Sequence, residues 1–126
     1  MFVRLTFFLC FISFAAAMVG GWTKQDVNST DVQDLVDKVV TKYNEESNDL
    51  FYHVPVKVVS AESQVVAGVQ YKIVLTLGQS SCLKNQVSAA DFNASNCEEK
   101  SESKRKDVTA TIWSKPWENF EQITFE

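Results

Sequence analysis

One segment near the start of the chain alternates apolar and polar residues with the period of an α-helix. Its apolar side chains recur at spacings of three and four residues and are Val32, Leu35, Val36, Val39, Val40 and Tyr43. This spacing predicts an amphipathic helix with one buried stripe. Thr30 and Gln33 have the spacing of a capping box, which predicts where the helix begins. The stripe ends near Tyr43, and the polar run 44–49 predicts a turn.

After this turn the period falls to two, which is the pattern of half-buried strands. Val54, Val56 and Val58 are predicted to share one face of a first strand, in which Pro55 fits an edge position or a bulge. Three later faces follow the same alternation: Val69, Tyr71, Ile73, Leu75 and Leu77, then Val108, Ala110 and Ile112, then Ile123 and Phe125. A further short strand is predicted at 22–24, and residues 78–104 are predicted to be irregular.

Together these segments predict an α+β fold with one helix and four to five strands. The connection at 64–68 is short and contains Gly68, which predicts a β-hairpin. Short connections require antiparallel pairing, because parallel strands need long crossovers. One face of the sheet then buries the helix stripe, while the other face meets solvent.

Residues 1–17 have the composition of a secretory signal peptide. Arg4 precedes an apolar run at 5–14, and alanines at 15–17 are the small residues that signal peptidase accepts. The run is too short for a transmembrane anchor, and a buried N-terminal helix is the rival interpretation. Cleavage after residue 17 leaves one secreted domain over 18–126 with no membrane span. The net charge of −4 gives no electrostatic reason to bind nucleic acid.

The sequence shows no constellation of residues suited to catalysis. His53 is the one histidine, in a predicted strand, where packing or surface exposure is expected rather than catalysis. Cys10 leaves with the signal, so Cys82 and Cys97 remain and are expected to form a disulfide in an oxidising compartment. A zinc site is the rival, but two cysteines and one histidine cannot fill a tetrahedral shell without carboxylates. We therefore predict that the protein is not an enzyme and uses no cofactor or metal.

Three short stretches place apolar residues or glycines outside the regular elements. They are Gly20 and Gly21 after the signal, the turn Gln64, Val65, Val66, Ala67 and Gly68, and the dipeptide Pro116-Trp117. Apolar loop tips suggest a contact surface, and tryptophan is enriched at binding hot spots. Trp22 and Trp113 are assigned to packing, and the basic run 104–106 to a solvated surface.

These stretches resemble the motifs of the cystatin family in composition and in order. Residues 64–68 fit the Q-x-V-x-G signature, Gly20 resembles the N-terminal glycine, and Pro116-Trp117 resembles the dipeptide of the second hairpin. The resemblance covers residues 19–121 and includes the helix and the Cys82 to Cys97 loop of secreted type 2 cystatins. No cysteine follows Cys97, so the second disulfide typical of vertebrate members is absent. With its short N-terminal arm, the chain is more similar to invertebrate cystatins, including those of nematodes.

The resemblance implies a secreted, monomeric inhibitor that binds papain-like cysteine peptidases (cathepsins) reversibly, tightly and competitively. It also implies the cystatin fold, in which one long helix packs across a curved antiparallel sheet. A wedge that fills the peptidase cleft would comprise Val19, Gly20, Gln64, Val65, Val66, Ala67, Gly68, Pro116 and Trp117. Val19 would occupy an apolar subsite, Val65 and Val66 would lie near the catalytic centre, and Trp117 would contact the primed side.

Ser47, Asn48 and Asp49 follow the helix and resemble the loop with which some type 2 cystatins block legumain, an asparagine-specific peptidase. The plainer interpretation is a helix-ending turn, which also favours Asn and Ser. Asn28 and Asn93 begin sequons for N-glycosylation, which permit modification in a secreted protein without requiring it.

Two other functions stay open on the sequence alone. The first is a non-inhibitory secreted binding module that keeps the cystatin fold. The three stretches would then be a flexible tail, an ordinary tight turn and a buried tryptophan after a strand breaker. The second is an enzyme on a helix-wrapped sheet, of the isomerase or dehydratase kind. That function requires a catalytic carboxylate or histidine inside a closed cone.

Overall fold

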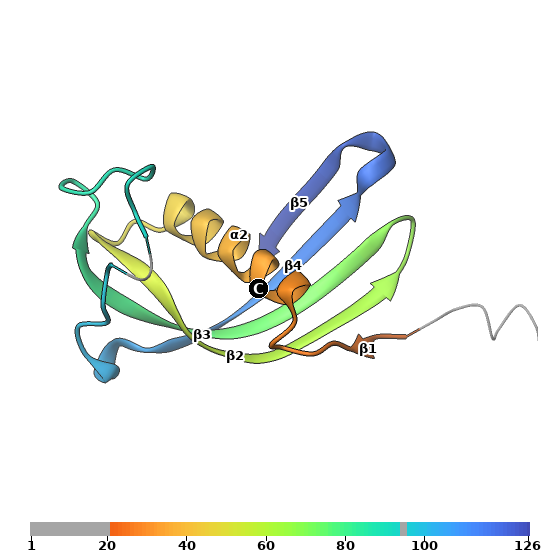
Figure 1. The fold of residues 1–126 in the computed structure, drawn as a ribbon, viewed down its shortest axis with the longest axis horizontal. Helices are drawn as coiled ribbons and strands as arrows, with labels where there is room; N and C mark the ends of the chain where they lie inside the picture. Colours follow the sequence, from red (N-terminus) through yellow and green to blue (C-terminus); the bar gives the residue numbers. More distant parts are fainter. Residues whose placement is uncertain (1–20, 94–95) are drawn as a thin grey trace, which may run out of the picture.

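The computed structural model describes residues 21–93 and 96–126, which form one α-helix lying across a five-stranded sheet (Figure 1). The elements in chain order are β1 (Thr23–Lys24), α2 (Thr30–Glu46), β2 (Phe51–Val65), β3 (Val69–Leu83), the 3-10 helix η2 (Glu102–Lys104), β4 (Lys106–Lys115), the 3-10 helix η3 (Pro116–Glu118) and β5 (Phe120–Phe125). Neighbouring strands all pair antiparallel, in the order of the sequence. The predicted α+β fold is therefore confirmed, whereas the predicted signal peptide (1–17) lies outside the described residues.

The N-terminal end of α2 is capped one residue earlier than predicted. The Ser29 hydroxyl accepts a hydrogen bond from the Val32 amide (3.2 Å), so Ser29 is the N-cap and the predicted capping role of Thr30 is wrong. Gln33 does not close a capping box on Thr30. Its Nε2 donates instead to the carbonyl oxygen of Val27 (2.8 Å), which ties the approach to the helix onto its first turn.

The C-terminal end of α2 extends beyond the predicted stop near Tyr43. Asn44 is buried, and its amide pairs twice with the backbone of His53: Nδ2 donates to the carbonyl oxygen (3.1 Å) and Oδ1 accepts from the amide (2.8 Å). A buried side-chain amide is tolerated where its polar atoms are paired, so the helix continues to Glu46. Within the described ranges, no helix combines the length and apolar character needed to cross a membrane.

The core lies between α2 and the concave face of the sheet. Its buried apolar side chains come largely from the predicted faces: Val32, Val36, Val39 and Val40 of α2, Ala61 of β2, Ile73, Leu75 and Leu77 of β3, and Val108, Ala110 and Ile112 of β4. Partly buried side chains at its rim include Leu35, Tyr43, Ile123 and Phe125. Burying one branched side chain stabilises a fold by about 1.5–3 kcal/mol, so this shared core is what holds the helix on the sheet.

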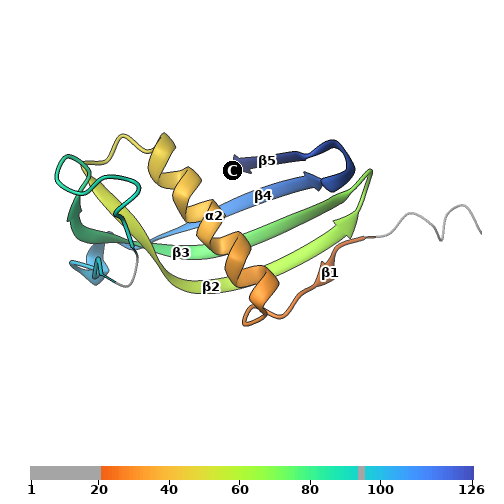
Figure 2. The same ribbon diagram turned by 45° about the horizontal axis from the view of Figure 1, so that its top comes forward.

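β2 is the irregular strand of the sheet. Its pairing with β3 shifts register at three places, between Phe51 and His53, Pro55 and Lys57, and Val58 and Ser60. A one-residue shift moves the following side chains to the other face, so Val54 is buried whereas Val56 is 36% exposed. The predicted shared face of Val54, Val56 and Val58 is therefore wrong. Of the two placements predicted for Pro55, an edge position or a bulge, the register shift beside it supports the bulge. Bulges bend a strand, and Figure 2 shows the sheet curving around α2.

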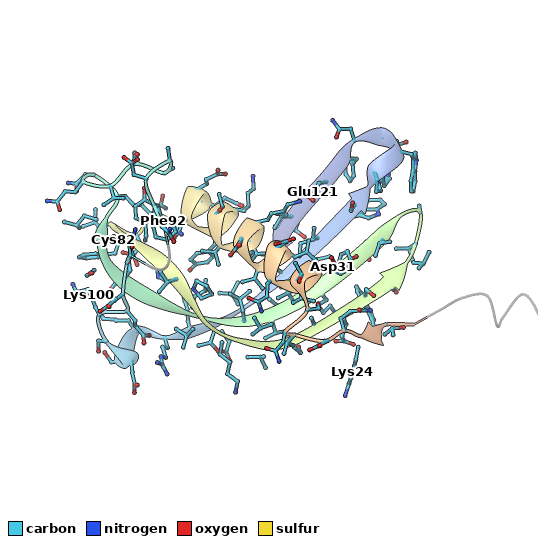
Figure 3. The ribbon with its side chains drawn as sticks, viewed as in Figure 1. Lys24, Asp31, Cys82, Phe92, Lys100 and Glu121 are labelled. Atoms are coloured by element: carbon cyan, nitrogen blue, oxygen red, sulfur yellow. A yellow bond between two sulfur atoms is a disulfide. The ribbon has the colours of Figure 1, made fainter. Side chains whose placement is uncertain are left out.

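β3 continues beyond its predicted end, through Gly78 to Leu83, so the prediction of irregular structure is wrong for residues 78–83. The extension places Cys82 on the strand, where it forms a disulfide with Cys97 (Figure 3). The two Cα atoms lie 5.6 Å apart, and the predicted bridge is confirmed. It closes the loop after β3 at the end of the sheet opposite the β2–β3 turn (Figure 1).

Candidate functional site

The β2–β3 and β4–β5 hairpins turn at the same end of the sheet and lie side by side (Figure 1, Figure 2). β3 and β4 pair directly, with Val69 opposite Ser114, so the turns that adjoin these residues are neighbours. We call residues 65–68 and 116–118 the hairpin edge. Pro116 is the first residue of η3, a position where a missing backbone donor has no consequence.

The first tip of the hairpin edge has a tightly constrained backbone. The Val66 amide donates to the Gly68 carbonyl oxygen (3.0 Å), and Ala67 and Gly68 have positive φ angles of 38° and 105°. A Cβ atom at position 68 would collide with the backbone carbonyl oxygen of Ser114 and lie 3.0 Å from the Lys115 side chain. Only glycine fits both the backbone angle and this close approach to β4.

Three large apolar side chains of the hairpin edge are exposed. Val65 is 82% exposed, Val66 37% and Trp117 67%, and they gather at one end of the molecule. Exposed apolar groups that cluster, rather than scatter, mark contact surfaces. Gln64 differs from them, because it is half-buried and its Nε2 donates to Oε1 of Gln70 across the hairpin (2.9 Å). The structure therefore ties the Gln64 side chain to the sheet rather than to the exposed edge.

Trp113 is a residue near the hairpin edge that the sequence assigned only to packing. Its indole Nε1 donates a hydrogen bond to the carbonyl oxygen of Ala67 (3.2 Å), and its ring meets Phe120 edge to face. The contact with Phe120 is consistent with the packing prediction, whereas the hydrogen bond to Ala67 was not predicted. No sequence pattern around Trp113 indicates that its side chain reaches Ala67, which is 46 residues away.

The predicted N-terminal arm residues Val19 and Gly20 lie outside the described residues. The described chain starts at Gly21 and enters β1, where Thr23 pairs with Ser63 near the end of β2. β1 therefore begins at the end of the sheet that carries the β2–β3 tip and runs away from it toward α2 (Figure 1). Trp22 is half-buried, with its ring centroid 4.9 Å from the Nζ of Lys72, as its assignment to packing predicts.

The turn that connects α2 to β2 presents Asn48 to solvent between two restrained neighbours. The Asp49 amide donates to the Ser47 hydroxyl (3.1 Å), and Asp49 Oδ1 accepts from the Phe51 amide (3.2 Å). Lys84 Nζ donates to the carbonyl oxygen of Ser47 (2.8 Å). The turn is thus held from both sides, and it lies at the end of the sheet opposite the hairpin edge (Figure 1).

Comparison with known proteins places this geometry in a family. The cystatin domain model matches residues 20–122. This chain is a cystatin. Onchocystatin of Onchocerca volvulus is 34% identical over 106 residues, which are 84% of this chain and 64% of that protein. Cystatin cpi-1 of Caenorhabditis elegans is 39% identical over 102 residues, 80% of this chain and 73% of that protein. The chain thus spans just under two thirds of the length of onchocystatin.

Solved cystatin structures share the fold. The crystal structure of Al-CPI matches with a TM-score of 0.76 and 43% identity, over 85% of this chain and 95% of that one. A salivary cystatin from the soft tick Ornithodoros moubata matches with a TM-score of 0.69 and 27% identity, over 85% and 95%. The predicted membership in the family, and the likeness to nematode cystatins, are both confirmed.

The cystatin has an unusual buried histidine beside its α2–β2 turn. His53 is 2% exposed, its Nδ1 has no hydrogen-bond partner among the described residues, and its Nε2 lies 3.5 Å from Asp49 Oδ2. Burial lowers the pKa of His53, and Lys106 and Lys84 lower it further, whereas Asp49 opposes them. Its ring packs edge to face on Tyr43. The imidazole is therefore a neutral packing group, as its assignment from the sequence expects.

Both predicted glycosylation sites are on the surface. Asn28 is exposed just before the N-cap of α2, and its amide donates to Asp26 Oδ1 (2.9 Å). Asn93 is also exposed, although the two residues that complete its sequon are outside the described ranges. Surface placement permits modification, and glycosylation stays a prediction.

Proposed function

We propose that this cystatin is a secreted, reversible, tight-binding competitive inhibitor of papain-like cysteine peptidases, and not an enzyme. The observation that supports this most is the hairpin edge, where Val65, Val66 and Trp117 stand exposed on two adjoining turns. The space under the sheet is filled by α2 and the core rather than by an open cone. That arrangement favours a protein that acts through its edge over the enzyme alternative.

In the proposed mechanism the hairpin edge enters the active-site cleft without being cut. Val65 and Val66 lie near the catalytic cysteine, and Trp117 packs on the primed side. Val19 and Gly20 add the non-primed contact. The edge presents no correctly placed peptide bond to the nucleophile, so the complex dissociates unchanged. Its affinity arises from a surface that is ordered before binding, because little conformational freedom is then lost.

Titration of papain and cathepsin L with the purified protein tests this function. We expect loss of peptidase activity at one-to-one stoichiometry, with recovery on dilution. Val65→Asp should abolish inhibition, because a charge on the most exposed of the three large apolar edge residues would be buried without a partner. Val59→Asp is the matched control, since Val59 is also exposed on β2 (47%) but lies away from the turn. Full peptidase activity at excess protein would refute inhibition and leave the non-inhibitory binding module.

We also propose that the α2–β2 turn is a second site, which inhibits legumain through Asn48 with Ser47 and Asp49 beside it. The exposed Asn48 on a restrained turn supports this, because a carboxamide held on a rigid scaffold suits a pocket selective for asparagine. The two sites are at opposite ends of the sheet. Inhibition of legumain should therefore persist after the protein has been saturated with inactive papain, and loss of it would contradict two separate sites.

Secretion follows from the proposed signal peptide at 1–17. N-terminal sequencing of the protein recovered from a eukaryotic culture medium should give a mature chain that begins at residue 18. A glycosidase-dependent mass shift in the same sample would show whether Asn28 or Asn93 carries glycan. Size-exclusion chromatography should give a monomer.

A further inference from the structure

Trp113 lies behind the hairpin edge, where it contacts the first tip and the two residues that flank the second tip. Its Nε1 donates to the carbonyl oxygen of Ala67 in the first tip (3.2 Å). Its ring centroid is 5.5 Å from that of Phe120, the residue where β5 leaves the second tip. Lys115 Nζ lies over both rings, 4.2 Å from the centroid of Trp113 and 4.9 Å from that of Phe120. One side chain thus joins the first tip to the base of the second.

Trp113 lies on the opposite face of the sheet from the core. Its neighbour Ile112 is fully buried under α2, and successive side chains of a strand point to opposite faces. Trp113 is therefore on the face away from the helix. It pairs with Gln70 of β3 and Gln122 of β5, behind both turns.

The backbone links the two tips only at their base, where Val69 pairs with Ser114 and Gly68 lies against the Ser114 carbonyl oxygen. Within the part of the chain that the structure describes, the turn hydrogen bonds close within each tip, from the Val66 amide to Gly68 and from the Asn119 amide to Pro116. The β3–β4 pairing reaches Val69 and goes no further. Beyond that point, side chains set the position of one tip relative to the other.

We propose that Trp113 is a positioning residue for inhibition, fixing the two tips of the hairpin edge in the one arrangement that fits a peptidase cleft. This inference rests on the proposed inhibition of papain-like peptidases. A surface that is in its binding arrangement for only a fraction of the time binds more weakly by that fraction. The hydrogen bond from Trp113 to Ala67 keeps that fraction high.

Trp113→Phe tests the proposal, because phenylalanine keeps an aromatic ring beside Phe120 and Lys115 but lacks the N–H. We expect the inhibition constant for papain to rise about 2- to 12-fold, the change that corresponds to the net contribution of one hydrogen bond. Replacing Trp113 by β-(3-benzothienyl)alanine, which keeps the bicyclic shape without the N–H, should give the same rise. Thr111→Val is the matched control, since Thr111 is on the same face of β4 and pairs with residues away from both tips.

Two readouts separate positioning from a purely structural role. A structural role lowers the melting temperature and leaves the inhibition constant of the folded protein unchanged. For Thr111→Val we expect the inhibition constant to equal that of the parent. Positioning also raises the inhibition constant at 25 °C and speeds amide hydrogen exchange at Val66. Parent-like inhibition by Trp113→Phe, with an active parent, would overturn the positioning role alone. A parent that leaves papain active would overturn the proposed function and the role of Trp113 with it.

Discussion

Adding one methyl group at position 68 should disturb the hairpin edge more than any other change of this size. Gly68 has a φ of 105°, outside the range that residues with a side chain usually adopt. Alanine there would place its Cβ against the carbonyl oxygen of Ser114, which is held in the β3–β4 ladder. The Lys115 side chain can move aside, but a paired backbone carbonyl cannot. The turn must therefore move away from β4 to make room.

The structure gives a magnitude for this change. A residue held at an unfavourable backbone angle costs of order 1–3 kcal/mol. For a domain of about 100 residues, each kcal/mol lowers the melting temperature by roughly 4–8 °C, so Gly68→Ala should melt about 4–24 °C lower. Strain that the free protein relieves by moving the turn away from β4 must be restored to fit a cleft, so the losses of stability and of affinity share this roughly 1–3 kcal/mol. Complete relief would correspond to inhibition that is roughly 5- to 150-fold weaker, with an unchanged melting temperature.

Thermal unfolding followed by circular dichroism, together with papain titration, measures both effects. Gly21→Ala is the control for stability, because a Cβ there would meet no atom within 4 Å. We expect it to melt within about a degree of the parent, as surface changes usually do. If Gly68→Ala also melts with the parent and inhibits papain equally well, the turn is not restrained by β4 and the reasoning about the hairpin edge fails.

Trp117→Ala should weaken papain inhibition by about 1–3 kcal/mol, as loss of a hot-spot ring does. The melting temperature should change little because the side chain is 67% exposed, and the reverse pattern would place the ring in the core. Asn48→Lys should abolish legumain inhibition and leave papain inhibition within about a factor of two, as for independent sites; parallel loss of both activities would contradict this. The free energy of unfolding should fall as the pH drops below about 6.5. Burial lowers the pKa of His53 in the folded protein, so below that pH the unfolded chain binds a proton that the folded chain does not. Urea titrations at pH 5 and 7 should show a smaller difference for His53→Phe than for the parent, and an equal difference would exclude His53 as its source.

The core could be predicted from the sequence because its signals are local. The valines of α2 and the alternation around Ile73 and Ile112 needed only the periods of a helix and a strand. Local signals failed where the outcome depends on a distant partner. Val56 turns outward because the β2–β3 register shifts at Pro55. No pattern within β2 distinguishes that shift from regular alternation.

The candidate site also has a part that could be predicted from the sequence and a part that could not. The exposed tip residues, such as Val65 and Trp117, were found from motifs that can be read along the chain. Their arrangement in space could not be predicted from motifs, because it depends on the pairing of Val69 with Ser114 and on the hydrogen bond from Trp113 to Ala67. Both contacts join segments more than forty residues apart. A motif search reports which residues are present, whereas strand register decides which of them meet.

The simple order of the sheet also has a consequence for how the molecule folds and binds. Tight turns join β2 to β3 and β4 to β5, and a long ladder pairs β3 with β4. β1, in contrast, reaches β2 across the whole helix, and Gln25 bonds to Ser63 over 38 residues of sequence. Contacts between distant segments form late and open early, and β1 contributes only two residues of ladder. We expect β1 to fray while the rest of the sheet stays closed. Association with a peptidase would then proceed in two steps: the hairpin tips dock first, and β1 closes onto β2 afterwards.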